Sequence, residues 1–317
     1  RYTYRDLLDR ASHVADTLRR LGLAVGGRVM IVSENRPEWV VTYFGVLKAG
    51  GVAVPVDREA TLEEVVSIAR HAAPFACVVS DKVQDRIDVR GALEELAAAP
   101  TAEGAPRVAV KVLGLSELVT WTGLLSRAAL PALPPLTLSG RADEMASLIF
   151  TSGTTGRPKG VMLSHRNFAS LLSKLAAVFD LDKHDGLLSV LPLHHTFEFT
   201  AGMLMPLMRG AQITYLSDVN ADTLSEAFSE AHVTGMVGVP ALYQALYRRV
   251  TKQIIDRLPD TVSPWVLRLL DRLLDATRWL RERSQRLLGF DPNLARLIYY
   301  PIHRRFGGKL RLMFSGG

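Results

Sequence analysis

The sequence predicts an α/β fold with parallel-rich sheets covered by helices. Short apolar runs, such as residues 28–33, 52–55 and 75–79, alternate with longer segments of helical periodicity. Such runs are typical of strands buried on both faces, and the helices between them indicate crossover connections between parallel strands. The chain has 317 residues, of which 48% are hydrophobic and 22% charged, a composition typical of globular proteins.

The first eighty residues contain three predicted helices and three predicted strands. Thr3 suits the N-cap of a helix over residues 3–21, and Gly22 suits its C-terminal stop. Pro37 suits the first turn of a second helix, which should end before Gly50. The remaining elements are a helix over residues 61–71 and strands over residues 28–33, 52–55 and 75–79.

Residues 81–138 have a less regular pattern. They contain an Ala- and Glu-rich helical segment and an apolar run over residues 108–112 that indicates a strand. The proline-rich residues 131–140 are typical of a surface linker. We therefore expect a first sheet unit over residues 1–130 and a second over residues 141–317.

The second unit should begin with a strand over residues 145–150, a loop rich in Gly, Thr and Ser, and a helix that Ser164 caps. A further apolar helix should run to Arg209, where Gly210 stops it. Because the chain ends on the strand-like LRLMFSGG without a closing element, we expect the domain to continue beyond it. The other predicted elements are strands over residues 186–191, 211–216 and 234–239, a helix over residues 222–232 and a helix that begins at Pro240.

Cysteine content and charge exclude several classes of protein. The single cysteine, Cys77, excludes a disulfide scaffold and a cysteine-based zinc site, and we expect a buried strand residue in a cytoplasmic protein. The formal net charge is +6, and residues 251–309 hold twelve Lys or Arg against six Asp or Glu. Because this segment accounts for the whole excess, the charge favours a membrane surface or an anionic ligand over nucleic acid.

The segment TSGTTGRPKG, residues 151–160, follows a predicted strand and has the composition of a phosphate-binding loop. Glycines let backbone amides converge on an anion, hydroxyls add donors, and Lys159 supplies a mobile positive charge. It is not the loop of the P-loop NTPases, because the residue five positions after Gly153 is Pro158. Composition alone leaves a flexible surface loop as the alternative.

The longer string TSGTTGRPKGVMLSH resembles the phosphate-binding signature of the adenylate-forming superfamily, which includes acyl-CoA synthetases, peptide-synthetase adenylation domains and luciferases. Further resemblance lies in SENRPEWVVTYFGVLKAGGVAVPVD, LPLHHTFEFTAG, GVPALYQAL and the terminal SGG. The resemblance implies that the loop binds the triphosphate of ATP. It also implies that a hydroxyl among Thr151, Thr154 and Thr155 helps to hold Mg²⁺, which prefers oxygen ligands. The residues expected to contact the nucleotide are Thr151, Ser152, Gly153, Thr154, Thr155, Gly156 and Lys159, together with Ser315, Gly316 and Gly317 of the SGG segment.

The segment LPLHHTFEFTAG contains two further candidates. By resemblance, His195 orients the substrate carboxylate for in-line attack on the α-phosphate, so His195 and Lys159 are the expected catalytic residues. The neighbouring His194 is the alternative to His195. Phe199 aligns with an aromatic residue that gates the acyl tunnel of long-chain fatty acyl-CoA synthetases, although a core aromatic is an equal interpretation. If the segment is helical, the four-residue spacing predicts that His195 and Phe199 share one cavity near the loop.

An insert over residues 251–309 precedes the last strand, and its amphipathic pattern between Trp265 and Leu288 resembles the long-chain fatty acyl-CoA synthetase branch. The resemblance implies ATP-dependent activation of a long-chain fatty acid to an acyl-adenylate, followed by thioester formation with coenzyme A. The alternatives are a fatty acyl-AMP ligase or acyl-carrier-protein synthetase, and a non-catalytic nucleotide- or lipid-binding fragment. We expect a cytoplasmic protein with peripheral membrane contact through the basic insert.

Some parts of the superfamily sequence have no counterpart before Gly317. These are the Tyr-Gly-x-Thr-Glu segment, whose Glu helps to bind Mg²⁺, the ribose-binding Asp, and the C-terminal domain with its catalytic Lys. A glycerolipid acyltransferase is excluded, because no histidine is followed by Asp five positions later. We therefore expect the chain alone to be incomplete for turnover.

Overall fold

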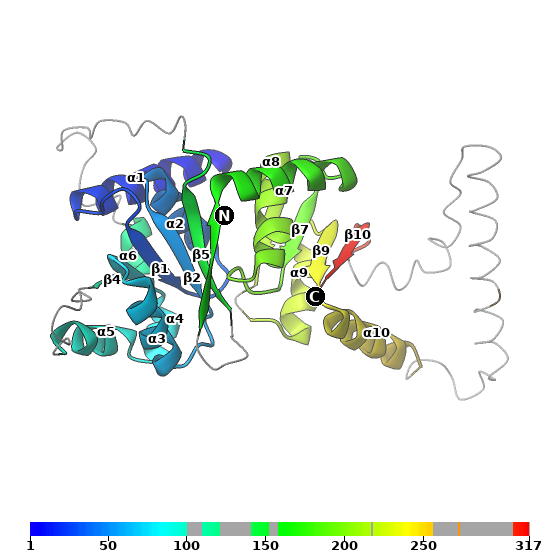
Figure 1. Ribbon diagram of the computed structural model, residues 1–317. Coiled ribbons are helices and arrows are strands. Elements are labelled where there is room, and N and C mark those ends of the chain that lie inside the picture. The colour runs from blue at the N-terminus through cyan, green and yellow to red at the C-terminus, as the bar shows by residue number, and fades with distance from the viewer. Residues whose placement is uncertain are drawn as a thin grey trace. The chain divides into compact units, whose positions relative to one another are not determined.

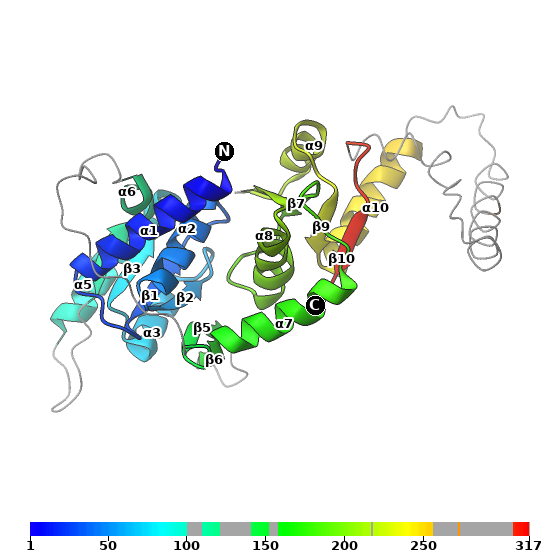
Figure 2. The same cartoon turned by 90° about the horizontal axis from the view of Figure 1, so that it is seen from above.

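Two compact units make up the part of the chain that the computed structural model describes, namely residues 1–99, 110–120, 141–151, 158–216, 218–255, 272 and 307–316 (Figures 1 and 2). The described residues include two sheets, one of six strands and one of four. The first unit comprises Arg1–Asp180, Leu191–Met205 and Tyr215–Ser217, and the second comprises Leu181–Val190, Pro206–Thr214 and Asp218–Gly317.

The six-stranded sheet of the first unit has the order β4-β3-β1-β2-β5-β6. β1 pairs in parallel with β2 and β3, β3 with β4, and β2 with β5, whereas β6 runs antiparallel to β5. Every residue of β2 and β3 is buried, as expected for parallel strands with helices on both faces. The predicted fold class is therefore confirmed. The strands are β1 (Arg28–Val32), β2 (Val52–Val56), β3 (Ala76–Val79), β4 (Lys111–Gly114), β5 (Met145–Thr151) and β6 (Lys159–Ser164).

Two groups of helices pack in this unit: α1, α2 and α6 contact one another, whereas α3 and α4 each contact α5 (Figure 1). The three helices predicted in the first eighty residues are all present, with ends close to the predicted ones. The helices are α1 (Tyr4–Arg20), α2 (Pro37–Lys48), α3 (Leu62–Ala72), α4 (Asp81–Arg86), α5 (Val89–Ala98), α6 (Leu115–Thr120) and α7 (His165–Val178).

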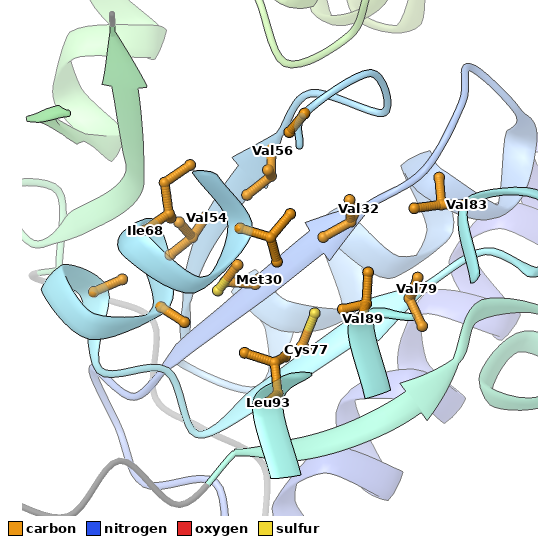
Figure 3. Close-up of a cluster of buried hydrophobic side chains, with 14 of the residues drawn as sticks. Met30, Val32, Val54, Val56, Ile68, Cys77, Val79, Val83, Val89 and Leu93 are labelled. Carbon is orange, nitrogen blue, oxygen red and sulfur yellow. The ribbon is translucent and has the colours of Figure 1, made fainter. Parts of the chain in front are cut away.

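Figure 3 shows the hydrophobic core that β1, β2 and β3 form with α3 and α5. Its members include Met30, Val54, Ile68, Cys77 and Leu93, each at most 8% exposed. Cys77 is a fully buried strand residue, as predicted. Burial raises the pKa of its thiol to about 12, so the thiol stays protonated near neutral pH.

Local sequence signals set the ends and the packing of α1. Thr3 and Asp6 form a capping box at its start, and Gly22 follows its end at φ +101°. Gly45 of α2 lets the two helices approach closely, because a Cβ there would lie 2.4 Å from Cγ1 of Val14. A glycine inside a helix costs stability through backbone entropy, so its presence here reflects this packing.

The four-stranded sheet has the order β10-β9-β7-β8, with β9 parallel to both β7 and β10. The Asp185 carboxylate accepts hydrogen bonds from Nε and Nη2 of Arg311 at 2.9 and 2.5 Å and from Oγ1 of Thr234 at 2.6 Å. These residues precede β7, β10 and β9, so one buried carboxylate ties three neighbouring strands together. Burial would raise the pKa of Asp185, but its hydrogen bonds to Arg311 and Thr234 outweigh this effect and lower the pKa. The elements are β7 (Gly186–Ser189), β8 (Gln212–Tyr215), β9 (Gly235–Gly238), β10 (Leu312–Ser315), α9 (Ala221–Glu230) and α10 (Pro240–Ile255).

The boundary between the two sheet units differs from the prediction. β5 and β6 belong to the first sheet, so the second unit does not begin at residue 141. The sequence does not predict β6, because most of its residues are exposed and KGVMLS lacks the alternation of a half-buried strand. The predicted linker, residues 131–140, lies outside the described residues, as does most of the predicted insert over residues 251–309.

Other differences are local. The sequence does not predict α4 and α6, because six residues are too few to reveal helical periodicity. The strand expected over residues 108–112 is found at Lys111–Gly114. The apolar helix predicted to end at Arg209 begins as a π-helix, η2 (Glu198–Leu204), and continues as α8 (Met205–Arg209).

Candidate active site

The predicted phosphate loop lies at the tip of the β5–β6 hairpin. Thr151 ends β5 and pairs with Lys159, the first residue of β6. Both residues are exposed, and Oγ1 of Thr151 donates a weak hydrogen bond to the Lys159 carbonyl at 3.5 Å. The hairpin therefore brings both ends of the loop together at the carboxyl end of β5. Five of the nucleotide contacts predicted in this loop lie outside the described residues: Ser152, Gly153, Thr154, Thr155 and Gly156.

A second segment, residues 191–195, is held near the carboxyl ends of β1 and β2 in the same unit. The Nδ2 atom of Asn35, three residues after β1, donates to the Leu191 carbonyl at 2.6 Å. Its Oδ1 atom accepts from the Leu193 amide at 3.0 Å. Nε2 of His194 lies 3.6 Å from Oδ2 of Asp57, the residue after β2. The segment is thus tied to two adjacent parallel strands.

The two histidines of this segment have different environments. Their ring centroids are 4.1 Å apart, but the His194 side chain is 13% exposed, whereas His195 is an exposed residue. Burial lowers the pKa of His194 to about 4; the Asp57 carboxylate opposes this effect, and His195 adds to it. His194 is therefore neutral near pH 7, and His195 is the histidine whose ring is accessible to a ligand.

Phe199 is a core residue in this structure. It is 1% exposed, and its ring centroid lies 4.8 Å from that of Tyr43, 5.1 Å from Phe168 and 6.2 Å from Trp39. The interplanar angles of 55–66° are typical of favourable tilted and edge-to-face contacts. The structure thus supports the interpretation as a core aromatic, and it does not place His195 and Phe199 in a shared environment. The tunnel-gating role remains a prediction.

Glu198 begins η2, and its side chain is fully buried. A Cβ at Gly202 would lie 2.3 Å from its Oε1 atom, so Gly202 leaves the space that this carboxylate occupies. Burial raises the pKa of Tyr215, and the negative charge of Glu198 raises it further. π-Helices occur frequently at functional sites, and this one begins three residues after His195.

The C-terminal candidates lie in the second unit, where Ser315 ends β10. The Gly316 amide donates to the Gly238 carbonyl at 3.3 Å, which places the end of the described chain at the carboxyl ends of β9 and β10. Gly317 lies outside the described residues.

The Thr151 hydroxyl fits a role as one oxygen ligand of Mg²⁺, because it is exposed at the mouth of the loop and hard cations prefer oxygen. The other two candidate ligands, Thr154 and Thr155, are not described. The described residues contain no cluster of three or more His, Cys, Asp or Glu side chains suited to a metal ion. Nor does any helix among them have the length and apolarity needed to span a membrane.

A cavity of about 640 Å³ opens elsewhere in the first unit. Its lining includes Arg28, Val52 and Met145, the first residues of β1, β2 and β5. It therefore lies at the amino ends of the strands, opposite to the edge that carries the loop. Ligands of open α/β sheets bind outside the carboxyl ends, so the geometry favours the loop edge as the active site.

The sequence alone does not identify Asn35 or Asp57 as site residues. Both are polar residues that closely follow a predicted buried strand, at the edge where parallel strands place functional groups. That position is the signal that could have found them. Their contacts with Leu191, Leu193 and His194 span more than 130 residues of sequence, so no local pattern reveals them.

Known proteins share this sequence and fold. The mitochondrial malonate–CoA ligase of Mus musculus is 34% identical over 256 residues, a match that covers 77% of this chain and 40% of that protein. A long-chain-fatty-acid–CoA ligase of Homo sapiens is 30% identical over 249 residues, covering 75% of this chain and 36% of that protein. The crystal structure of ATP-bound MatB from Rhodopseudomonas palustris has a TM-score of 0.62 at 29% identity, covering 77% of this chain and 45% of that one.

The chain thus spans less than half the length of each of these proteins. The family model described as AMP-binding enzyme matches residues 1–317, that is, every residue of the sequence. The resemblance inferred from TSGTTGRPKGVMLSH is confirmed: the chain belongs to the AMP-binding enzyme family.

Proposed function

We propose that a protein containing this chain activates a long-chain fatty acid with ATP and transfers the acyl group to coenzyme A. The observation that carries the proposal is the β5–β6 hairpin. Thr151 and Lys159 are exposed at the two ends of a Gly- and Thr-rich loop, at the carboxyl edge of a parallel sheet. The family match and the ATP-bound structural relative support nucleotide binding at this edge.

The proposed reaction has two steps. In the first, a carboxylate oxygen of the fatty acid attacks the α-phosphorus of ATP, and the bond to the pyrophosphate oxygen breaks. In the second, the coenzyme A sulfur attacks the acyl carbonyl carbon, and the carbon–oxygen bond to AMP breaks. The leaving groups are pyrophosphate and AMP. Both steps move negative charge onto phosphate oxygens, so fixed positive charge and amide donors lower the barrier.

The described residues have distinct roles in this proposal. The Lys159 ammonium binds phosphate oxygens as a point charge, and the exposed His195 ring orients the acid's carboxylate. Mg²⁺, when bound, neutralises phosphate charge, and the Thr151 hydroxyl is the described residue suited to contact it. His194, neutral near pH 7, contacts the His195 ring in a tilted arrangement without adding a second positive charge.

Two carboxylic acids are candidate substrates, because one relative is a malonate–CoA ligase and another is a long-chain-fatty-acid–CoA ligase. A dicarboxylate requires a cation for its second carboxylate, whereas a fatty acid requires apolar walls. The amphipathic pattern between Trp265 and Leu288 resembles the long-chain fatty acyl-CoA synthetase branch and favours a fatty acid. Malonate is the second candidate.

The test is acid-dependent exchange of labelled pyrophosphate into ATP by the full-length protein. Lys159→Ala removes a charge-assisted contact worth about 1.5–3 kcal/mol, so exchange should fall roughly tenfold to a hundredfold. Lys174→Ala, which removes an exposed lysine from α7, is the matched control and should retain wild-type exchange. Equal exchange by the Lys159→Ala variant and the wild type would exclude Lys159 as a phosphate ligand.

A further inference from the structure

Asn35 connects two parts of the first unit that lie far apart in sequence. Its side-chain amide donates to the carbonyl of Leu191 at 2.6 Å and accepts from the amide of Leu193 at 3.0 Å. The two bonds engage one acceptor and one donor of the same backbone segment, so they fix its orientation as well as its position. Asn35 itself is buried and lies three residues after the end of β1, which is an interior strand of the sheet.

The segment after Leu193 is held from its other side. The His195 amide donates to the Pro192 carbonyl at 3.0 Å, which closes a turn. The Phe199 amide donates to the His195 carbonyl at 2.9 Å, and the Phe199 ring is locked in the aromatic cluster with Trp39 and Tyr43. The backbone of His195 is therefore fixed at both ends, with Asn35 on the N-terminal side and the aromatic cluster on the C-terminal side.

The His195 side chain depends on this frame. Its side chain is exposed, and its ring centroid lies 4.1 Å from that of His194. His194 in turn lies against Asp57 and follows directly after the residue that Asn35 binds. A rotation of the backbone at Leu193 would move both rings together. A small misplacement of a reacting or orienting group lowers the reaction rate strongly, because the reacting atoms must be closely aligned.

We propose that Asn35 is a positioning residue that holds the His194–His195 pair at the carboxyl edge of the first sheet, and thereby sets the orientation of His195 toward the carboxylate substrate. Asn35 itself contacts neither substrate nor nucleotide in this proposal. The catalytic part rests on the proposed function, whereas the structural part stands on the two hydrogen bonds alone. The experiment therefore has one arm for each.

The structural arm measures amide hydrogen exchange of residues 191–195 in the full-length protein. Asn35→Ala removes both bonds and should increase exchange at Leu193 at least tenfold. Asn35→Asp keeps the acceptor for the Leu193 amide but sets a carboxylate oxygen against the Leu191 carbonyl, so its effect should be intermediate. The Asn35→Asp variant also keeps the side-chain volume, so it serves as the test variant if Asn35→Ala folds poorly. Ser80→Ala is the control, because Ser80 is buried after β3 and donates to Glu34 at 2.6 Å, and none of its hydrogen bonds involves residues 191–195.

The catalytic arm is a double-mutant cycle with His195→Ala, read as kcat and KM for ATP. Asn35→Ala should lower kcat about tenfold to a hundredfold and leave KM for ATP within about twofold, while Ser80→Ala should remain near wild type. If Asn35 acts through His195, adding Asn35→Ala to His195→Ala should cost less than about threefold.

Additive losses in the cycle, or an equal loss for Ser80→Ala, would overturn the positioning role. Unchanged exchange at Leu193 in Asn35→Ala would overturn the structural claim. If the wild-type protein adenylates no acid, the proposed function falls and the catalytic role of Asn35 falls with it. The exchange arm still decides whether Asn35 holds the segment.

Discussion

Replacement of His194 by Gln should make the stability of the protein less sensitive to acid. Burial lowers the pKa of His194 from an ordinary value near 6.5 to about 4, with Asp57 opposing and His195 adding to the shift. Between these two values the unfolded state binds a proton that the folded state excludes. Stability from this group is therefore fully present above about pH 6.5 and is lost as the pH falls toward about 4.

The size of the effect follows from the shift. One pKa unit corresponds to about 1.4 kcal/mol, and from pH 7 to pH 5 the linkage amounts to about 2 kcal/mol. The side chain is only 13% exposed, so solvent screening removes little of it. The glutamine side chain is neutral at both pH values and of similar length, so it removes the titration with little change in volume.

The assay is urea unfolding of the full-length wild type and the His194→Gln variant at pH 7 and pH 5. The wild type should lose about 2 kcal/mol more than the variant between the two pH values. His71→Gln, at an exposed position near the end of α3, is the control and should follow the wild type. An equal loss in the wild type and the His194→Gln variant would refute the reasoning.

Two further predictions concern stability. Asp185→Asn should lower the free energy of unfolding of the second unit by about 1–3 kcal/mol, which is below the usual cost of breaking a buried ion pair because Arg311 is 43% exposed. The control in urea unfolding is Asp143→Asn, which breaks an exposed ion pair with Arg166 and should change stability little. Equal effects of the two substitutions would contradict the buried role of Asp185. Gly45→Ala should lower the free energy of unfolding by about 1–3 kcal/mol, because the added Cβ would lie 2.4 Å from Cγ1 of Val14. Adding Val14→Ala should recover part of this loss. An unchanged urea midpoint for Gly45→Ala would show that α1 and α2 can move apart without cost.

The elements that the sequence predicts are those whose burial or end-capping imposes a clear local pattern. The runs over residues 28–33, 52–55 and 75–79 are strands in the structure because each is buried on both faces. The Thr3 cap and Gly22 mark the ends of α1 by local chemistry alone. Both kinds of signal are contained in a short window of sequence.

The elements that the sequence does not predict depend on long-range contacts or on weak burial. β6 is exposed along most of its length, and its assignment to the first sheet depends on pairing with β5. The motif LPLHHTFEFTAG draws attention to His195, but it does not reveal that Phe199 packs in a core or that η2 is a π-helix. Asn35 reaches Leu191 across 156 residues of sequence. Only the folded sheet brings such residues together.

The most direct test of the central claim is to detect the adenylate intermediate. The full-length protein would be incubated with ATP and Mg²⁺ in the absence of any thiol, with hexadecanoate or malonate as the acid, and the bound products identified by mass spectrometry. We expect hexadecanoyl-AMP and one equivalent of pyrophosphate per active site, with much less adenylate from malonate. The His195→Ala variant should form the same adenylate more slowly. Malonyl-AMP in preference to hexadecanoyl-AMP would contradict the fatty acid assignment, and the absence of an adenylate with either acid, or with acids of intermediate length, would contradict the proposed activity itself.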